Sequence, residues 1–271
     1  MAPPKSSSLQ RRVVSALVIL PICVAAVWYG GWAYAALLAV ISAAMCWEWA
    51  GICGAHDKAI QGTMIIAAVA APLGLQIYGF PAVAGAVAVG SAVVLVLALA
   101  KRASNRWILL AGLPYVVFGI VSSGWLRGDD QTGLWTVLWL VAVVVATDIG
   151  AYFSGRAIGG PKLAPSISPN KTWSGLLGGM ACAGAAGWVM GNTVADGATL
   201  LLVGVSVLLA VVAQFGDLIE SKLKRHFDVK DASQLIPGHG GFLDRFDGYL
   251  TVMPAAALIT VSVGESPITW Q

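Results

Sequence analysis

The sequence contains few charged residues and no arrangement of residues typical of a zinc site. Asp, Glu, Lys and Arg together make up 11% of its 271 residues, whereas hydrophobic residues make up 58%. Because soluble domains carry about 25% charged residues, this composition argues against a soluble globular protein. The four Cys and three His show no paired metal-ligand spacing. We therefore expect the cysteines to be small apolar packing residues rather than zinc ligands.

Long hydrophobic runs dominate the chain instead. A run of about 20 apolar residues is long enough to cross the hydrocarbon core of a bilayer as a helix. The sequence therefore predicts an all-α, polytopic integral membrane protein with nine transmembrane helices. The expected spans are 13–29, 33–52, 60–78, 82–100, 107–126, 133–153, 173–192, 197–219 and 249–264.

The Lys and Arg residues indicate which side of the membrane each loop occupies. If the N-terminus is cytoplasmic and nine helices follow, 15 of the 16 basic residues lie in cytoplasmic segments, and only Arg127 lies outside. This distribution follows the positive-inside rule, so we predict a multi-pass protein of the cell membrane with a cytoplasmic N-terminus. The first span has no small-residue cleavage pattern after it, so we expect it to be retained. The net charge of +3 then reflects topology, and we expect no nucleic-acid partner.

Residues 217–247 gather ionisable side chains that are scarce elsewhere. This segment holds six of the thirteen acidic residues, five of the sixteen basic residues and two of the three His. Asp217, Glu220, Ser221 and Lys224 recur at helical spacing, so they share one face if the preceding span continues as a helix. Asp217 lies near the expected membrane surface, where a carboxylate needs a cation or a metal ion. A salt-bridged Asp–Lys pair at the helix end is the alternative to a metal site.

The sequence PGHGGFLDRFD ends this segment. Its Pro and Gly residues rule out a regular helix and let backbone N–H groups approach an anion. Two roles fit His239, namely contact with a phosphate or substrate and a hydrogen bond that braces the loop. Asp244 and Asp247 flank Arg245 near the start of the last span. They can act as helix caps or, together with Asp217, as oxygen ligands for Mg²⁺.

A second polar region begins inside an otherwise apolar span. Asp148, Tyr152 and Arg156 recur every four residues and therefore share a helix face. An intramembrane Asp indicates a functional site, with an interhelical hydrogen bond or ion pair as the alternative. The motif SPNKT, residues 168–172, precedes the next span, where its ammonium, hydroxyl and N–H groups can bind a phosphate. An ordinary helix cap fits this motif equally well, and the chain has no GxxxxGK[ST] motif.

Both polar regions lie on the cytoplasmic side in the predicted topology. Together they supply carboxylates for a metal ion, Lys and Arg for a polyanion, and Gly-rich backbone for phosphate. This combination predicts phosphoryl or nucleotidyl transfer to a lipid headgroup, because such catalysis rests on positioning and charge neutralisation.

The segment from Ser221 to Asp247 resembles the signature of a known enzyme family. Its pattern SKLKR-x4-KDAS-x2-IPGHGGFLDRFD is similar, without a break, to that of the phosphatidate cytidylyltransferases (CDP-diacylglycerol synthases). The upstream motifs DIGAYF-x-GR and SPNKT also resemble that family, and the specific likeness covers roughly residues 146–250. One position departs from the pattern, because the family commonly has an acidic residue where this chain has Ser174.

The resemblance implies transfer of CMP from CTP to phosphatidate, which gives CDP-diacylglycerol and pyrophosphate. It implies Mg²⁺ as cofactor, as two divalent ions or as one divalent ion with a monovalent ion. Residues 1–130 would form N-terminal transmembrane helices, and residues 131–271 a C-terminal transmembrane catalytic region. The expected metal ligands are Asp217, Asp244, Asp247 and Asp148. Three of these, all but Asp247, are also expected to be catalytic, together with Lys171. The expected substrate-binding residues are Ser168, Thr172, Ser221, Lys224, Arg225, Lys230, Asp231, His239, Gly240, Gly241 and Arg245.

Two other functions fit parts of this pattern. Another CTP-using membrane enzyme, such as a polyprenol kinase or an archaeal-type lipid cytidylyltransferase, would share the chemistry and differ in the acceptor. A transporter would use intramembrane carboxylates as ion sites, but it should show internal repeats and broken helices near the membrane midplane. The sequence shows no such repeat. Gly- and Ala-rich spans such as 173–192 permit close helix packing within or between chains, so a homodimer is compatible with the sequence.

Overall fold

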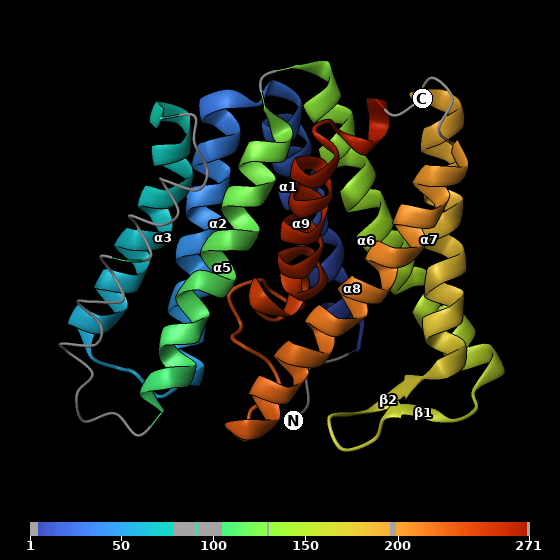
Figure 1. Ribbon diagram of the computed structural model, residues 1–271. Coiled ribbons are helices and arrows are strands. Elements are labelled where there is room, and N and C mark those ends of the chain that lie inside the picture. The colour runs from blue at the N-terminus through green and yellow to red at the C-terminus, as the bar shows by residue number, and fades with distance from the viewer. Residues whose placement is uncertain (1–4, 79–89, 91–104, 129, 196–198, 270–271) are drawn as a thin grey trace. The chain divides into compact units, whose positions relative to one another are not determined.

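Helices form most of the structure (Figure 1). The computed structural model describes residues 5–78, 90, 105–128, 130–195 and 199–269. Six of the helices in these ranges are long and apolar enough to cross a membrane. They are α2 (Gly31–Ile52), α3 (Lys58–Tyr78), α5 (Arg106–Arg127), α6 (Gln131–Ile158), α8 (Thr199–His226) and α9 (Leu243–Val263).

Two further helices, α1 (Lys5–Tyr29) and α7 (Trp173–Thr193), also coincide with expected spans. The predicted class, an all-α protein with several membrane-spanning helices, is therefore confirmed. The expected span 82–100 lies outside the described residues, so the number of nine helices remains a prediction, as does their orientation.

The chain divides into two compact units. The first unit contains the chain up to Gly124 together with His226–Phe246, and the second contains Trp125–Arg225 and Asp247–Gln271. The polar segment 217–247 is thus shared between the two units, with residues 226–246 belonging to the first. The prediction that residues 131–271 form the catalytic region remains a prediction.

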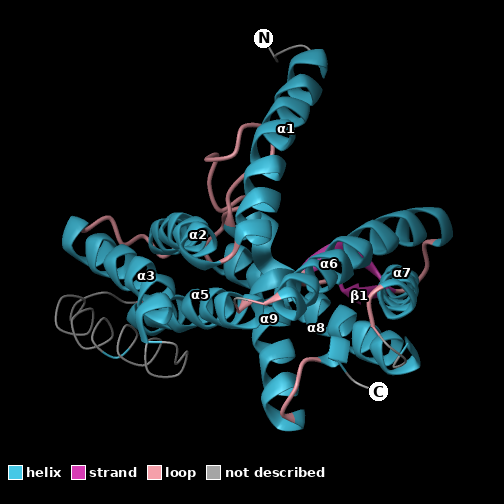
Figure 2. Ribbon diagram, turned by 90° about the horizontal axis from the view of Figure 1, so that it is seen from above, coloured by secondary structure: helices cyan, strands magenta, loops and turns pink. Residues whose placement is uncertain are grey.

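In the first unit, α2 lies beside α3 (Figure 2) and also contacts α5. The Ser42 hydroxyl donates to the carbonyl oxygen of Ala68, 2.9 Å away. The indole Nε1 of Trp49 donates to the carbonyl oxygen of Ile108 at 3.0 Å. A side chain at Gly112 would overlap the Trp49 ring. These contacts with α3 and α5 hold α2 in a defined position.

In the second unit, small residues let α7 pack closely against its neighbours. A Cβ on Gly179 would lie 2.9 Å from the carbonyl oxygen of Thr147 in α6, and one on Gly187 would lie 2.7 Å from that of Leu202 in α8. Such close approach is typical of helices that associate in lipid through van der Waals contact. Buried small residues recur every four positions along α7, at Gly175, Gly179, Ala183, Gly187 and Gly191, and Gly184 beside Ala183 is buried as well.

A short antiparallel strand pair precedes α7 at its foot (Figure 1). Strand β1 (Lys162–Ala164) pairs with β2 (Ser168–Thr172), and Lys162 lies opposite Thr172. Thr172 then caps α7, because its hydroxyl accepts a hydrogen bond from the backbone N–H of Gly175 at 3.1 Å. The sequence predicted the cap as one of two roles for the SPNKT motif, but it did not predict the strands.

The glycine stripe gives a direct test of the packing in the second unit. We expect Gly187→Ala to lower the apparent unfolding midpoint, because the new methyl group overlaps the Leu202 backbone and overpacking costs about 1–3 kcal/mol. Gly204→Ala in α8 is the matched control, since a Cβ there meets nothing within 4 Å. Thermal unfolding of both purified variants measures the difference. Equal midpoints for the two variants would contradict the described α7–α8 contact.

Candidate functional site

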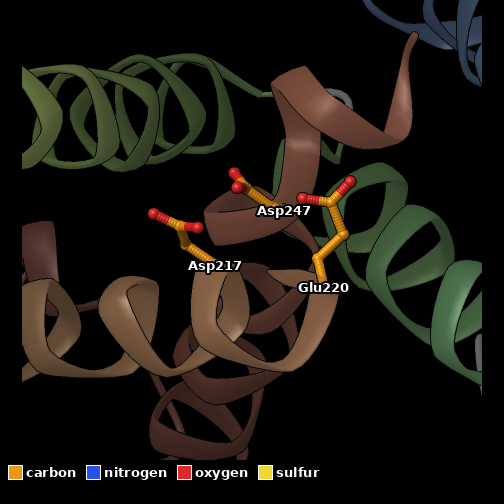
Figure 3. A group of neighbouring side chains, drawn as sticks. All are labelled: Asp217, Glu220 and Asp247. Atoms are coloured by element: carbon orange, nitrogen blue, oxygen red, sulfur yellow. The ribbon is translucent and has the colours of Figure 1, made fainter. Parts of the chain in front are cut away.

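Three carboxylates meet in the second unit (Figure 3). Asp217 and Glu220 lie three residues apart on one face of α8, and Asp247 comes from α9. Each offers one carboxylate oxygen, and these oxygens all lie within 4.8 Å of one another. Gly216 permits the close approach of the helices, because a Cβ there would lie 2.5 Å from the Thr251 hydroxyl. The arrangement is a compact set of hard oxygen ligands.

Two lysines accompany the carboxylates. Lys171, at the end of β2, forms an ion pair with Asp217. Lys224 forms one with Glu220 at 3.0 Å, one helical turn along α8. The Asp–Lys pair that the sequence left open for Asp217 is therefore present, and it links the SPNKT motif to the polar end of α8. Ser221 adds a hydrogen bond of 3.2 Å from its hydroxyl to Asp217.

Asp148 completes the acidic surroundings of this cluster. It lies exposed on α6 and near enough to Asp247 for the two carboxylates to repel each other, while Asp217 repels and Lys171 attracts the same Asp247 carboxylate. The structure thus brings together Asp148, Lys171, Asp217 and Asp247, four residues that the sequence assigned to the site. Tyr152 and Arg156, predicted on the same helix face as Asp148, are neighbours there, because Arg156 donates to the Tyr152 hydroxyl at 2.9 Å.

The PGHGG sequence forms a tight turn in the first unit. The N–H of His239 donates to the carbonyl oxygen of Ile236 at 2.9 Å, and the N–H of Ile236 donates to that of Gly240 at 2.8 Å. Pro237 followed by Gly238, whose φ is 80°, matches the residue preferences of a type II turn. Gly240 also has a positive φ of 86°. Both positions therefore favour glycine, because residues with a side chain rarely adopt a positive φ.

Side chains brace this turn on both sides. Nδ1 of His239 and the Ser15 hydroxyl of α1 share a hydrogen bond of 2.9 Å. Nε of Arg245 donates to the carbonyl oxygen of His239 at 2.8 Å. The loop-bracing role that the sequence left open for His239 is therefore present, and contact of His239 or Arg245 with a substrate remains a prediction.

Asp244 organises the same loop from the start of α9. Its Oδ2 accepts hydrogen bonds from the backbone N–H groups of Ala232 and Gly241, each at 2.9 Å. The carboxylate therefore ties the beginning of the loop to its end. Its expected role as a metal ligand remains a prediction.

The remaining predicted residues are exposed or half-buried. Arg225 and Lys230 are exposed, Ser168 is half-buried at the start of β2, and Asp231 lies 3.5 Å from the side-chain amide of Gln234. Ser174, at the position where the resembling family commonly has an acid, donates to the carbonyl oxygen of Gly159. It thereby ties the start of α7 to the end of α6.

Two acidic residues were missed by the sequence assignment. Glu220 belongs to the carboxylate cluster. It was not among the predicted ligands, although its three-residue spacing from Asp217 already placed it on the same helix face. Glu48 in α2 is buried and accepts hydrogen bonds from Ser233, Phe242 and Leu243. The only sequence signal for Glu48 was its place as a single acid within an apolar span.

The fold and the cluster define a class, a multi-pass helical membrane protein with a carboxylate–lysine site suited to phosphate chemistry. Comparison with known proteins then identifies the family. The sequence profile of the cytidylyltransferase family matches residues 10–263, and the chain belongs to this family.

Individual relatives match over most of the chain. A phosphatidate cytidylyltransferase of Brucella suis is 40% identical over 258 residues, which cover 93% of this chain and 92% of that protein. One of Pseudomonas aeruginosa is 36% identical over 274 residues, covering 94% and 98%. One of Bacillus subtilis is 46% identical over 131 residues, or 48% of each chain. The resemblance recognised in the signature is therefore confirmed over nearly the whole length.

The Lys224–Glu220 pair gives a test of the site's electrostatics. Glu220 is 1% exposed and Lys224 14% exposed, so we expect Lys224→Met to leave a poorly compensated buried carboxylate. Breaking a buried ion pair costs about 3–5 kcal/mol, and the apparent unfolding midpoint should fall by several degrees. Lys222→Met, at an exposed position of the same helix, is the control. A Lys224→Met protein as stable as the control would show that the pair is not structural.

Proposed function

We propose that this protein is a phosphatidate cytidylyltransferase, which transfers CMP from CTP to phosphatidate and releases CDP-diacylglycerol and pyrophosphate. The observation that carries the proposal is the cluster of Asp217, Glu220 and Asp247, with its two lysines, in a chain of the cytidylyltransferase family. The names of the relatives support phosphatidate as the acceptor.

The carboxylate cluster fits a magnesium ion. Mg²⁺ prefers oxygen ligands and is commonly held by a few carboxylates together with substrate phosphates. When all five side chains are ionised, the two lysines leave the three carboxylates with one unbalanced negative charge, which favours a further cation. Mg²⁺ at this position would supply charge neutralisation for the phosphates of CTP. We propose Asp217, Glu220 and Asp247 as its ligands, with Asp148 nearby for a second divalent or a monovalent ion.

The protein's own residues then act mainly by positioning. A phosphatidate oxygen forms a bond to the α-phosphorus of CTP, while the bond from that phosphorus to the bridging oxygen of the β-phosphate breaks and pyrophosphate leaves. The attacking oxygen is already anionic at neutral pH, so no general base is required. Lys171 and Lys224 lie beside the carboxylates and are placed to bind phosphate oxygens. We retain Arg225, Lys230, His239 and Arg245 as predicted substrate contacts.

The proposed setting is the cell membrane. The positive-inside distribution supports nine transmembrane helices with a cytoplasmic N-terminus, which puts both polar regions on the side where CTP is present. Phosphatidate would reach the site within the bilayer. A homodimer is compatible with the Gly- and Ala-rich spans, and we expect no nucleic-acid partner.

The reaction itself is tested by following the label of CTP. Purified protein with Mg²⁺, phosphatidate and CTP labelled at the α-phosphate should yield a labelled CDP-lipid and release unlabelled pyrophosphate. In a parallel reaction with CTP labelled at the γ-phosphate, the appearance of label in the lipid would establish a kinase instead. Absence of any CTP-dependent lipid product in protein that is folded and membrane-inserted would refute both activities.

The metal assignment is tested by isosteric substitution of each carboxylate. We expect Asp217→Asn, Glu220→Gln and Asp247→Asn each to lower kcat by about 100-fold or more, because each removes a negative ligand from the metal. Asp57→Asn is the control, since Asp57 is exposed and its hydrogen bond to the N–H of Ala59 is one that Asn can keep. Near wild-type turnover in any of the three variants would remove that residue from the ligand set. Asp148→Asn and Asp244→Asn test the two remaining predicted ligands in the same assay.

A further inference from the structure

Glu48 is a buried carboxylate in a helix long and apolar enough to span a membrane. It is 1% exposed and lies in α2, between Trp47 and Trp49. A carboxylate in such a place is costly unless hydrogen bonds compensate for the lost hydration. The position of those hydrogen-bond donors therefore indicates what the residue does.

All three donors come from the signature segment. Oε1 accepts from the Ser233 hydroxyl at 2.5 Å and from the N–H of Phe242 at 2.9 Å, and Oε2 accepts from the N–H of Leu243 at 2.8 Å. The sequence separations are 185, 194 and 195 residues. One side chain of α2 thus holds both the beginning and the end of the loop that contains PGHGG.

The two backbone contacts lie at the N-terminus of α9, which begins at Leu243. The first N–H groups of a helix have no partner within the helix, and a negative charge there also complements the helix dipole. Glu48 therefore caps α9 from a different helix. Gly241 makes room for it, because a Cβ at that position would lie 2.5 Å from Oε1.

The hydrogen bonds continue into the loop from both ends. Ser233 accepts a hydrogen bond from the N–H of Leu235 at 3.1 Å, while Asp244 ties Ala232 to Gly241. On the other side, Trp49 fixes α2 against α5 through its bond to Ile108. Glu48 therefore connects a helix of defined position to the polar loop before α9.

We propose that Glu48 is a positioning residue for the signature loop. Its carboxylate sets the course of the backbone from Ser233 to Leu243, and so holds His239, Gly240 and Gly241 in the conformation in which they meet the substrate. The substrate part of this proposal rests on the proposed function, whereas the ordering of the loop does not depend on it.

Hydrogen exchange of the full-length protein in lipid nanodiscs tests the ordering without any substrate. In Glu48→Gln, which keeps the shape but has a single acceptor oxygen, we expect the amides of 232–243 to exchange about tenfold faster or more. Glu48→Asp, which keeps the charge, should recover part of the protection. Ser42→Ala is the control, because Ser42 is equally buried in α2 but bonds to Ala39 and Ala68 instead of the loop.

Wild-type exchange of 232–243 in Glu48→Gln, or an equal increase in Ser42→Ala, would overturn the proposal. If Glu48→Gln cannot be purified, Ser233→Ala tests the same proposal, because it removes one of the three groups that donate to Glu48. It should then raise exchange in the same segment, and unchanged exchange would count against Glu48.

Kinetics separate positioning from mere stability. At a temperature where every variant stays folded, Glu48→Gln should raise KM for CTP or lower kcat by about tenfold. Ser42→Ala should keep wild-type values. Equal kinetic constants for Glu48→Gln and wild type would limit Glu48 to a structural role. If the wild-type protein forms no CDP-lipid, the proposed function fails, and the exchange experiment still decides the role of Glu48 in the loop.

Discussion

The cost of carrying carboxylates on membrane-spanning helices governs the polar part of this structure. Each such group needs a cation or a set of N–H and O–H donors close by, and the chain supplies both kinds of partner. Asp217 is compensated by Lys171 from the strand pair, and Glu48 by donors from the loop before α9. The contacts that compensate these carboxylates therefore join segments that are far apart in sequence. The polar loops owe their defined conformations to these contacts.

The two kinds of compensation have different consequences for chemistry. In the first unit, the carboxylates of Glu48 and Asp244 accept hydrogen bonds from backbone N–H groups, so their role in the structure is to fix the loop around PGHGG. In the second unit, Asp217 and Glu220 are paired with flexible lysines. A lysine can move to a substrate phosphate when a metal ion takes its place beside the carboxylate, whereas a backbone amide cannot. This contrast is the reason for proposing the metal site in the second unit.

Much of this arrangement could be predicted from the sequence. The helices follow from hydropathy, because the membrane demands about 20 apolar residues per span, and the shared face of Asp217 and Glu220 follows from helical spacing. The strand pair could not be predicted, since strands as short as Lys162–Ala164 have no periodicity of their own. Glu48 was missed for a different reason. Its role depends on donors 185 to 195 residues away, and a single acid in an apolar run gives no indication of its partners.

We propose that Asp217, Glu220 and Asp247 form the metal site of a cytidylyltransferase. Anomalous diffraction from crystals grown with Mn²⁺ and a non-hydrolysable CTP analogue tests it most directly. We expect an anomalous peak in contact with these three carboxylates and with phosphate oxygens of the analogue. A peak coordinated by Asp244 without Asp217 or Glu220, or a nucleotide bound with its phosphates away from the cluster, would contradict it.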